Sequence, residues 1–298
     1  MSKVFIGMTI YNGEKFLSQA IESLLSQTYP DITLFISDDA STDGSRSICE
    51  KYSKKDERVV YYRQPKNIGM FPNFKFVLDK ADGKYFMWAA QDDIREENYI
   101  ETCVSNLKKL DIGLATTIMA VIDSSGKNIT VESELIRLSS KPGYLNVARY
   151  VMQPEILGKC NIMYSLFKTD VIKKVWEIYP QRSEWGSDYH FSLAAISHFG
   201  FYVDPKILFK KRSGGFSSPN IMVNEIDSVK KIKFNNPNNH IFPFGRFNNY
   251  LRGHMEALMG TPYRPLAAFL LLIRLPRSFL IHLRGKNYRK FISRFLHK

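Results

Sequence analysis

Residues 4–13 read Val4-Phe5-Ile6-Gly7-Met8-Thr9-Ile10-Tyr11-Asn12-Gly13, and this stretch decides the fold of the chain. Residues 4–10 are apolar and rich in β-branched side chains, which is typical of a buried strand. Asn12-Gly13 then ends the run, and apolar residues recur at helical spacing from Phe16 to Leu25. The chain therefore begins with a strand, a turn and a helix.

The same order recurs along the first hundred residues. Further strands are expected at residues 31–37, 59–62 and 84–90, and further helices are expected to end near residues 54, 81 and 110. Alternation of this kind predicts an α/β fold, with a Rossmann-like, mostly parallel sheet flanked by helices. Ligands of such sheets bind beyond the carboxyl ends of the strands, where this chain carries polar clusters.

The pattern is weaker after residue 110. Residues 130–159 are expected to form an irregular excursion near the site, and residues 213–239, which include Gly214-Gly215, are expected to form a loop. The other expected elements are strands at residues 112–122, 162–167 and 201–209 and helices at residues 187–198 and 246–259.

The formal net charge of +13 is concentrated at the C-terminus. No acidic residue follows Glu256, whereas nine cations do: Arg264, Arg274, Arg277, Arg284, Lys286, Arg289, Lys290, Arg294 and Lys298. A nucleic-acid-binding protein should carry its cations on the folded domain, interleaved with aromatic side chains, so no nucleic-acid partner is expected.

The C-terminal segment is instead expected to meet a membrane surface. Its apolar run at residues 266–273 is far shorter than the roughly 20 residues of a membrane span. An amphipathic segment with many cations suits an interface with anionic lipid. The alternative is a terminal helix packed on the body with a solvated basic face. Three cysteines without a framework spacing and no signal-peptide pattern favour the cytoplasm, at the inner face of the cell membrane.

Two pairs of adjacent carboxylates follow expected strands. Asp92-Asp93 could hold a magnesium or manganese ion, since these ions are often bound by one or two carboxylates while diphosphate oxygens and water complete the shell. Asp38-Asp39 could accept the imide N–H of a uracil ring. The alternatives are a helix cap for the first pair and an acidic turn for the second.

Five pieces of sequence together resemble the family-two glycosyltransferases with the GT-A fold, which build bacterial polysaccharides. The pieces are Thr9-Ile10-Tyr11-Asn12, residues 23–29 (Ser-Leu-Leu-Ser-Gln-Thr-Tyr), residues 38–44 (Asp-Asp-Ala-Ser-Thr-Asp-Gly), Asn67-Ile68-Gly69 and Gln91-Asp92-Asp93. By this resemblance, Thr9 and Tyr11 would line the nucleotide base, with the Tyr11 ring stacked on it. Asp39 would bond the base edge, and Asn12 and Asn67 would complete the donor nucleotide site.

The resemblance also assigns the cation and the catalytic base. Asp93 would coordinate the Mg²⁺ or Mn²⁺ ion that bridges the diphosphate, and Asp92 would bind the ribose or assist at the metal. Gln91 stands where relatives usually carry the first residue of Asp-x-Asp. Asp188, which follows Ser187 instead of the usual Glu, would act as general base; a helix cap is the alternative.

A basic segment would close on the diphosphate by the same resemblance. Lys210, Lys211 and Arg212 are expected there in a loop, followed by Ser213 where relatives often carry histidine. An exposed basic loop is the alternative.

The resemblance implies three regions and one reaction. Residues 1–215 would form the GT-A domain, with a nucleotide-binding half to about residue 110 and an acceptor half at 111–215; residues 216–244 would be a linker and residues 245–298 a basic, helical, membrane-associated extension. The reaction would be inverting transfer from a UDP- or dTDP-sugar to a hydroxyl of a lipid-linked or polysaccharide acceptor, by one metal-assisted displacement.

The residues also bear on two other functions. A sugar-1-phosphate nucleotidyltransferase usually carries a glycine-rich, basic loop after the first strand, and residues 10–15 offer one glycine and no phosphate cradle. A non-enzymatic basic protein that binds nucleic acid or membrane is the other alternative.

Overall fold

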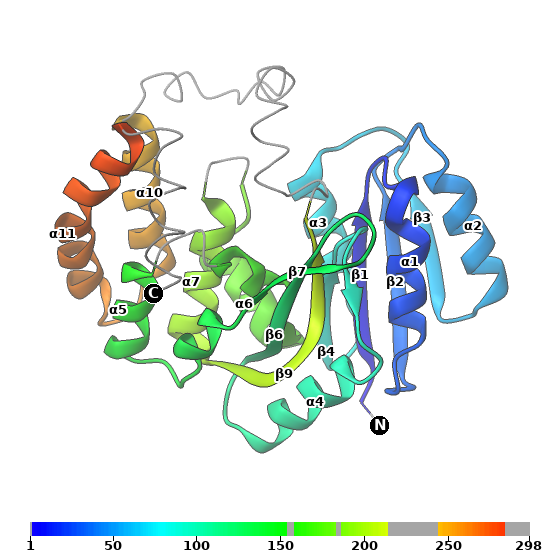
Figure 1. The fold of residues 1–298 in the computed structure, drawn as a ribbon, viewed down its shortest axis with the longest axis horizontal. Coiled ribbons are helices and arrows are strands. Elements are labelled where there is room, and N and C mark those ends of the chain that lie inside the picture. Colours follow the sequence, from blue (N-terminus) through cyan, green and yellow to red (C-terminus); the bar gives the residue numbers. More distant parts are fainter. Residues whose placement is uncertain (1, 154–157, 183–185, 214–243, 284–298) are drawn as a thin grey trace.

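The computed structural model describes residues 2–153, 158–182, 186–213 and 244–283 (Figure 1). Its N-terminal half contains four parallel strands in the order β3-β2-β1-β4. The strands are β1 (Val4–Ile10), β2 (Ile32–Asp38), β3 (Val59–Arg63) and β4 (Tyr85–Ala89), and the helices between them are α1 (Glu14–Leu25), α2 (Ser45–Lys55) and α3 (Met70–Asp79). The predicted repeat of strand and helix is therefore confirmed.

The second half of the sheet is mixed. β8 is antiparallel to both β4 and β6, β9 is parallel to β6, and β5 and β7 are short antiparallel additions. Parallel pairing covers most of the paired residues, as predicted. The strands are β5 (Ile94–Arg95), β6 (Leu114–Ile122), β7 (Asn128–Glu132), β8 (Leu166–Lys168) and β9 (Phe201–Arg212).

Helices bury an apolar core on each face of the sheet. On one face, α1 and α4 (Tyr99–Lys109) supply side chains such as Leu17, Ile21 and Leu107 at helical spacing. On the other face, α3, α6 (Thr169–Ile178) and α7 (Ser187–Phe199) pack around the fully buried Trp88. The two cores fix the strands, so the carboxyl ends of β1, β2 and β4 lie side by side.

Two local predictions were wrong. Residues 162–167 were expected to be a strand, but η3 (Lys159–Tyr164) is a 3-10 helix and only β8 is extended. A short buried apolar run has no periodicity that separates the two forms. Residues 210–212 were expected in a loop, but they continue β9 because β6 offers them partners as far as Ile122.

The region expected to be an irregular excursion contains regular elements. These are β7, η1 (Glu134–Leu138) and α5 (Tyr144–Met152). α5 has an apolar face, and its Val147 and Val151 are fully buried in the core that surrounds Trp88. This core is called the second core below.

The C-terminal helices pack on the body. α10 (Phe244–Ala257) lies against α7, and α11 (Arg264–Leu283) lies against α5 at the edge of the molecule opposite α2 (Figure 1). Ala257, Leu258, Ala267 and Leu271 join the second core. Along the described part of the chain, no helix has the length and apolarity needed to cross a bilayer. The expected linker up to residue 243 and the last fifteen residues lie outside the described residues.

Candidate active site

Side chains and main chain from three strand ends meet at one edge of the sheet. The Asp39 N–H donates to the Ile10 carbonyl oxygen at 2.9 Å, which joins the ends of β1 and β2. The Tyr11 N–H donates to Gln91 Oε1 at 2.9 Å, and Gln91 Nε2 donates to the Tyr11 carbonyl oxygen at 3.2 Å. The ends of β1 and β4 are therefore joined as well.

The turn between β1 and α1 is held by side chains from other segments. The N–H groups of Asn12, Gly13 and Glu14 donate to Ser41 Oγ, Ser45 Oγ and an Asp43 carboxylate oxygen, at 2.9–3.0 Å. With Tyr11, four successive main-chain donors are thus occupied. The turn is rigid before any ligand arrives.

Asn12 serves this turn with its side chain as well. Its φ of 49° lies in the left-handed region, which Asn tolerates better than most residues. Its Oδ1 accepts the Thr42 N–H at 2.8 Å. Asn12 therefore ties the first turn to the loop that follows β2.

Asp39 organises the loop that precedes α3. It is 3% exposed, and its two oxygens accept the N–H groups of Ile68 at 2.7 Å and Gly69 at 3.0 Å. Asn67 Oδ1 accepts the same Gly69 N–H. Gly69 has a φ of 91°, which only glycine adopts without strain.

The candidates for the base pocket, Thr9 and Tyr11, lie at the end of β1 and directly after it. Thr9 is partly buried and lies opposite Ser37 in the strand register. Tyr11 follows the strand end, and 37% of its surface is exposed. Neighbouring Asp38 is fully buried and accepts hydrogen bonds from Tyr61 and Arg63. The two members of the pair therefore differ: Asp38 bonds the side chains of β3, and Asp39 bonds the loop that precedes α3.

Asp92 and Asp93 form a buried pair of carboxylates, 7% and 6% exposed. Burial, and then the charge of Asp93, raise the pKa of Asp92 to about 7. Burial likewise raises the pKa of Asp93, although its Oδ1 accepts the Arg212 N–H at 3.0 Å. Two repelling carboxylates of this kind suit a divalent cation.

The donor set fits a cation that is shared with a ligand. Within the described ranges, no cluster of three or more His, Cys, Asp or Glu side chains could hold a metal ion. Mg²⁺ is commonly held by one or two carboxylates plus substrate phosphates. Asp92 and Asp93 are therefore a site that a diphosphate would complete.

The three basic residues predicted for the diphosphate differ in their surroundings. Arg212 is 2% exposed and its guanidinium lies 4.2 Å from the Phe16 ring centroid. Its nitrogens donate to the main-chain oxygens of Asp92, Asp123 and Ser124 and to Gln19 Oε1. Arg212 is thus committed to holding the Asp92-Asp93 segment.

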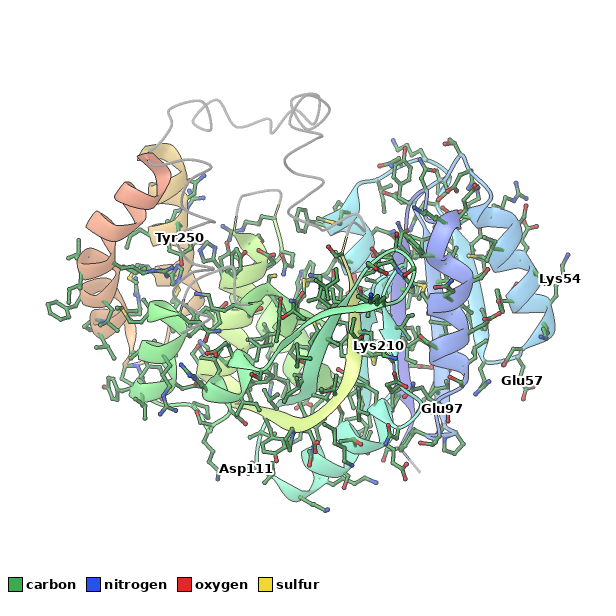
Figure 2. All side chains as sticks on the ribbon, in the orientation of Figure 1. Lys54, Glu57, Glu97, Asp111, Lys210 and Tyr250 are labelled. Carbon is green, nitrogen blue, oxygen red and sulfur yellow. The ribbon has the colours of Figure 1, made fainter. Side chains whose placement is uncertain are left out.

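Lys210 and Lys211 point to different surroundings, as neighbours on a strand do. Lys210, near the middle of the view in Figure 2, forms an ion pair with Glu96. Lys211 Nζ donates to Asn161 Oδ1 at 2.5 Å. Burial alone would lower the pKa of Lys211, but the charges around it, from Cys160, Asp93, Glu132 and Asp188, raise it. Lys211 is therefore one of the cations of the carboxylate site, together with Arg95 and Arg212, whose charges also oppose the rise in the pKa of Asp93.

Asp188 lies in the first turn of α7, after Gly186 with its φ of 85°. Burial raises the pKa of the Asp188 carboxyl, and one of its oxygens accepts the Tyr189 N–H at 2.9 Å. Burial raises the pKa of Tyr164, and the charges of Asp93, Asp92 and Asp188 raise it further. The charges of Asp188 and of the Asp92-Asp93 pair therefore both reach the Tyr164 hydroxyl.

Sequence reasoning missed three residues at this site. Gln91 was noted only as a departure from Asp-x-Asp, and its two-way bond to Tyr11 has no signal in the sequence. Asn161 and Glu132 come from η3 and β7, in the region without a clear pattern. One Glu132 oxygen is buried with no hydrogen-bond partner among the described residues, and burial raises its pKa.

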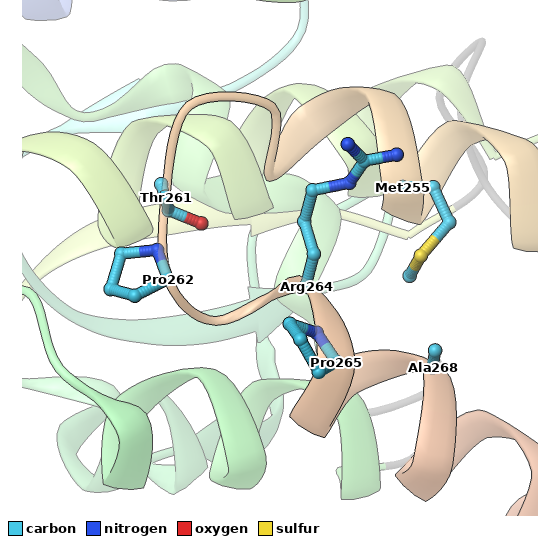
Figure 3. Close-up of a pocket in the computed structure, with 6 residues that line it drawn as sticks. All are labelled: Met255, Thr261, Pro262, Arg264, Pro265 and Ala268. Atoms are coloured by element: carbon cyan, nitrogen blue, oxygen red, sulfur yellow. The ribbon is translucent and has the colours of Figure 1, made fainter.

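A concave feature lies at the turn between α10 and α11, away from the candidate donor residues (Figure 3). Its volume is about 520 Å³, and it is lined by Met255, Thr261, Pro262, Arg264, Pro265 and Ala268. This lining contains no carboxylate and none of the candidate donor residues.

The family follows from comparison with known proteins. Residues 5–176 match the model described as Glycosyl transferase family 2, so the chain belongs to this family. The activity that this membership implies is that of a glycosyltransferase, in enzyme class 2.4.

Similar proteins agree with this assignment. Glycosyltransferase GlyA of Streptococcus pneumoniae is 30% identical over 113 residues, which cover 38% of this chain and 16% of that protein. Glycosyltransferase GlyG of the same organism is 33% identical over 36% of each chain. The chain thus spans only a minor part of these two relatives. An uncharacterized glycosyltransferase of Rickettsia typhi is 23% identical over 77% of this chain and 70% of its own.

Solved structures share the fold. S. aureus TarS in complex with UDP-GlcNAc has a TM-score of 0.66 at 15% identity, covering 97% of this chain and 77% of that one. The mannosyltransferase PcManGT of Pyrobaculum calidifontis, in complex with GDP-Man and Mn²⁺, has a TM-score of 0.56 at 14% identity, covering 98% and 83%. The GT-A fold of this chain is therefore established.

Proposed function

We propose that this glycosyltransferase transfers its sugar with inversion, from a UDP- or dTDP-sugar to an acceptor hydroxyl, in one displacement. The observation that carries the proposal is the joining of three strand ends by hydrogen bonds, Ile10 to Asp39 and Tyr11 to Gln91. This arrangement supports a donor site in which an aromatic ring and a buried carboxylate pair lie at the same edge of the sheet. Such a juxtaposition suits a nucleoside on one side and a cation-bound diphosphate on the other.

The base preference rests on Asp39. A carboxylate offers about four lone-pair sites, and the N–H groups of Ile68 and Gly69 use two of them. Uracil and thymine present one ring N–H that a remaining site could accept. Tyr11 would stack on the same base, and Thr9 and Asn67 would complete its surroundings.

Positive charge would stabilise the leaving diphosphate. When bound, a divalent cation, Mg²⁺ or Mn²⁺, held by Asp92 and Asp93 supplies positive charge to the diphosphate. Lys211 adds a positive charge of the protein itself. Its attraction for the diphosphate would become stronger as water leaves the site. Lys210 could join it only by leaving Glu96.

Asp188 is the proposed general base. It would take the proton of the acceptor hydroxyl as the oxygen attacks the anomeric carbon from the face opposite the diphosphate. Burial raises the pKa of Asp188, which makes the carboxylate a stronger base than an exposed Asp. No covalent intermediate is required.

The occupied turn argues against a nucleotidyltransferase. A loop that cradles phosphates needs free main-chain N–H groups. Here the four donors from Tyr11 to Glu14 are all accepted by protein side chains.

Binding measurements test the proposal. Calorimetry with UDP, dTDP and GDP, each with and without Mn²⁺, should give the tightest binding for UDP or dTDP with Mn²⁺. Asp93→Ala should lose the effect of Mn²⁺, whereas Asp188→Ala should bind as the wild type does and fail only in transfer. Full turnover by Asp188→Ala would remove it from the base role.

We also propose that the C-terminal helices bind anionic lipids at the inner face of the cell membrane. The enzyme would then lie beside a lipid-linked acceptor. Phe269, Leu272 and Ile273 form one stripe of α11 and are each more than half exposed, as are Tyr144 and Leu145 of α5. The two helices run side by side, since the Tyr144 and Tyr263 rings are 5.0 Å apart and Arg274 donates to the Val151 carbonyl oxygen. The nine cations after Glu256 complement anionic headgroups.

Flotation with liposomes tests this contact. The wild type should float with vesicles that contain phosphatidylglycerol and not with neutral vesicles. Leu272→Glu should reduce flotation, and Val131→Glu, which alters an exposed apolar residue on β7, should not. Equal flotation of the wild type and Leu272→Glu would refute the membrane-facing role of α11.

A further inference from the structure

The main chains of β1 and β4 stop pairing before they reach the candidate site. Their ladder of parallel pairs ends at Met8 and Ala89. Beyond this point one chain continues to Tyr11 and the other to Asp92 and Asp93. The carboxamide of Gln91 spans the two, accepting from the Tyr11 N–H and donating to the Tyr11 carbonyl oxygen.

A carboxamide side chain is suited to this pair of bonds at neutral pH. It carries a donor and an acceptor side by side, as a peptide group does, whereas a carboxylate carries acceptors only. The Gln91 side chain also lies directly against the main chain of Gly13, where an added Cβ would come within 2.6 Å of Gln91 Cδ and Oε1. The amide is therefore held on two sides.

We propose that Gln91 is a positioning residue that fixes the distance between the Tyr11 ring and the Asp92-Asp93 pair. The inference rests on the proposed function, in which Tyr11 contacts the base and the two carboxylates hold the cation on the diphosphate. A donor that reaches both must match that spacing. The departure from Asp-x-Asp at position 91 then exchanges a carboxylate for a link between the two halves of the donor site.

Three variants test this role. Gln91→Met keeps the length of the side chain and removes both hydrogen bonds, and Gln91→Glu keeps only the bond from the Tyr11 N–H. Gln27→Met is the matched control, because Gln27 also bonds main-chain groups of two segments: its Nε2 donates to Ser23 and Glu96 oxygens, and its Oε1 accepts from Ile100.

The readout is calorimetry with two probes, UDP with Mn²⁺ and pyrophosphate with Mn²⁺. Gln91→Met should raise the Kd of UDP about tenfold, the effect of two ordinary hydrogen bonds, and Gln91→Glu should raise it less. The Kd of pyrophosphate, which does not reach Tyr11, should stay within about twofold. The KM of the donor should rise with the Kd of UDP, and kcat should change less. Gln27→Met should lower the Tm and leave both Kd values unchanged.

Two results would overturn the inference. One is an unchanged Kd for UDP in folded Gln91→Met protein, and the other is an equal loss for both probes, which would make Gln91 part of the cation site instead. Failure of the proposed function has a different signature: the wild type itself would bind no UDP, with or without Mn²⁺, and both proposals would then fall.

Discussion

The two sides of the site differ in how their polar groups are satisfied. On the base side, the main-chain donors from Tyr11 to Glu14 and both oxygens of Asp39 have partners within the protein. On the catalytic side, the buried Glu132 Oε2 lacks a hydrogen-bond partner within the described residues. Asp92, Asp93 and Asp188 there all have raised pKa values.

This difference separates binding from chemistry. A turn that is already hydrogen-bonded loses little conformational freedom when a base arrives, so it favours affinity. A group of buried carboxylates is electrostatically unfavourable until a cation, a phosphate or an acceptor proton compensates it. The catalytic side is therefore expected to be the part that changes on binding, and substitutions there should act mainly on rate.

The largest effect is expected at Asp188. Asp188→Asn keeps the shape and removes the base, so kcat should fall about 10³-fold while the Kd of UDP stays unchanged. Steady-state kinetics and calorimetry measure the two quantities. Asp170→Asn, an exposed Asp in the first turn of α6, is the control and should retain full activity. A tenfold rise in the Kd of UDP for Asp188→Asn would contradict the prediction that substitutions on the catalytic side act on rate and not on nucleotide affinity.

A smaller effect is expected where the catalytic side is anchored. Arg212→Met would leave the carbonyl oxygens of Asp92, Asp123 and Ser124 without their buried donor. The free energy of unfolding should fall by about 3 kcal/mol. Arg46→Met removes an exposed pair with Glu50 and should change the free energy of unfolding far less. Urea denaturation measures both, and equal losses would contradict the anchoring role of Arg212.

The carboxylate pair should also make stability depend on pH. Because the pKa of Asp92 is raised to about 7, its contribution to folding is present below the unfolded value of roughly 4 and is lost as the pH rises through 7. Without divalent cations, the free energy of unfolding of the wild type should fall by about 2 kcal/mol relative to that of Asp92→Asn between pH 5 and pH 8. The comparison with this variant cancels the opposite contribution of His190 and His254, whose pKa values burial lowers. Saturating Mn²⁺ with UDP should oppose this relative fall.

Asp56 provides the opposite sign as a control. Its hydrogen bonds from Arg58 hold its pKa below the usual value, so its contribution is present at neutral pH and is lost only on acidification. Asp56→Asn should therefore leave the change between pH 5 and pH 8 as it is in the wild type. Denaturation at each pH decides the matter, and a difference between the wild type and Asp92→Asn that stays constant from pH 5 to pH 8 would contradict the prediction.

The base side was the easier half to predict. Its strands are buried runs bounded by Asn12-Gly13 and by acidic turns, so periodicity predicted the elements and the position of Tyr11 and Asp39 at one edge of the sheet. The catalytic side depends on contacts between distant segments. Lys211 and Arg212 carry adjacent positive charges, yet one lies among carboxylates and the other holds main-chain oxygens. Charge in a sequence does not reveal which buried oxygens it will meet.

The smallest effect is expected at Asn12. Its variants test whether this side chain stabilises the turn or contacts the nucleotide. Asn12→Gly keeps the left-handed backbone and loses only the bond to Thr42, so unfolding should cost about 0.5–1 kcal/mol less than in the wild type. Asn12→Ala adds strain at the same φ and should lose about 1 kcal/mol more. The Kd of UDP should rise no more than about threefold in either variant, since the side chain faces Thr42. A tenfold loss of UDP affinity in Asn12→Gly with an unchanged Tm would instead make Asn12 a direct ligand of the nucleotide, as the family resemblance implies.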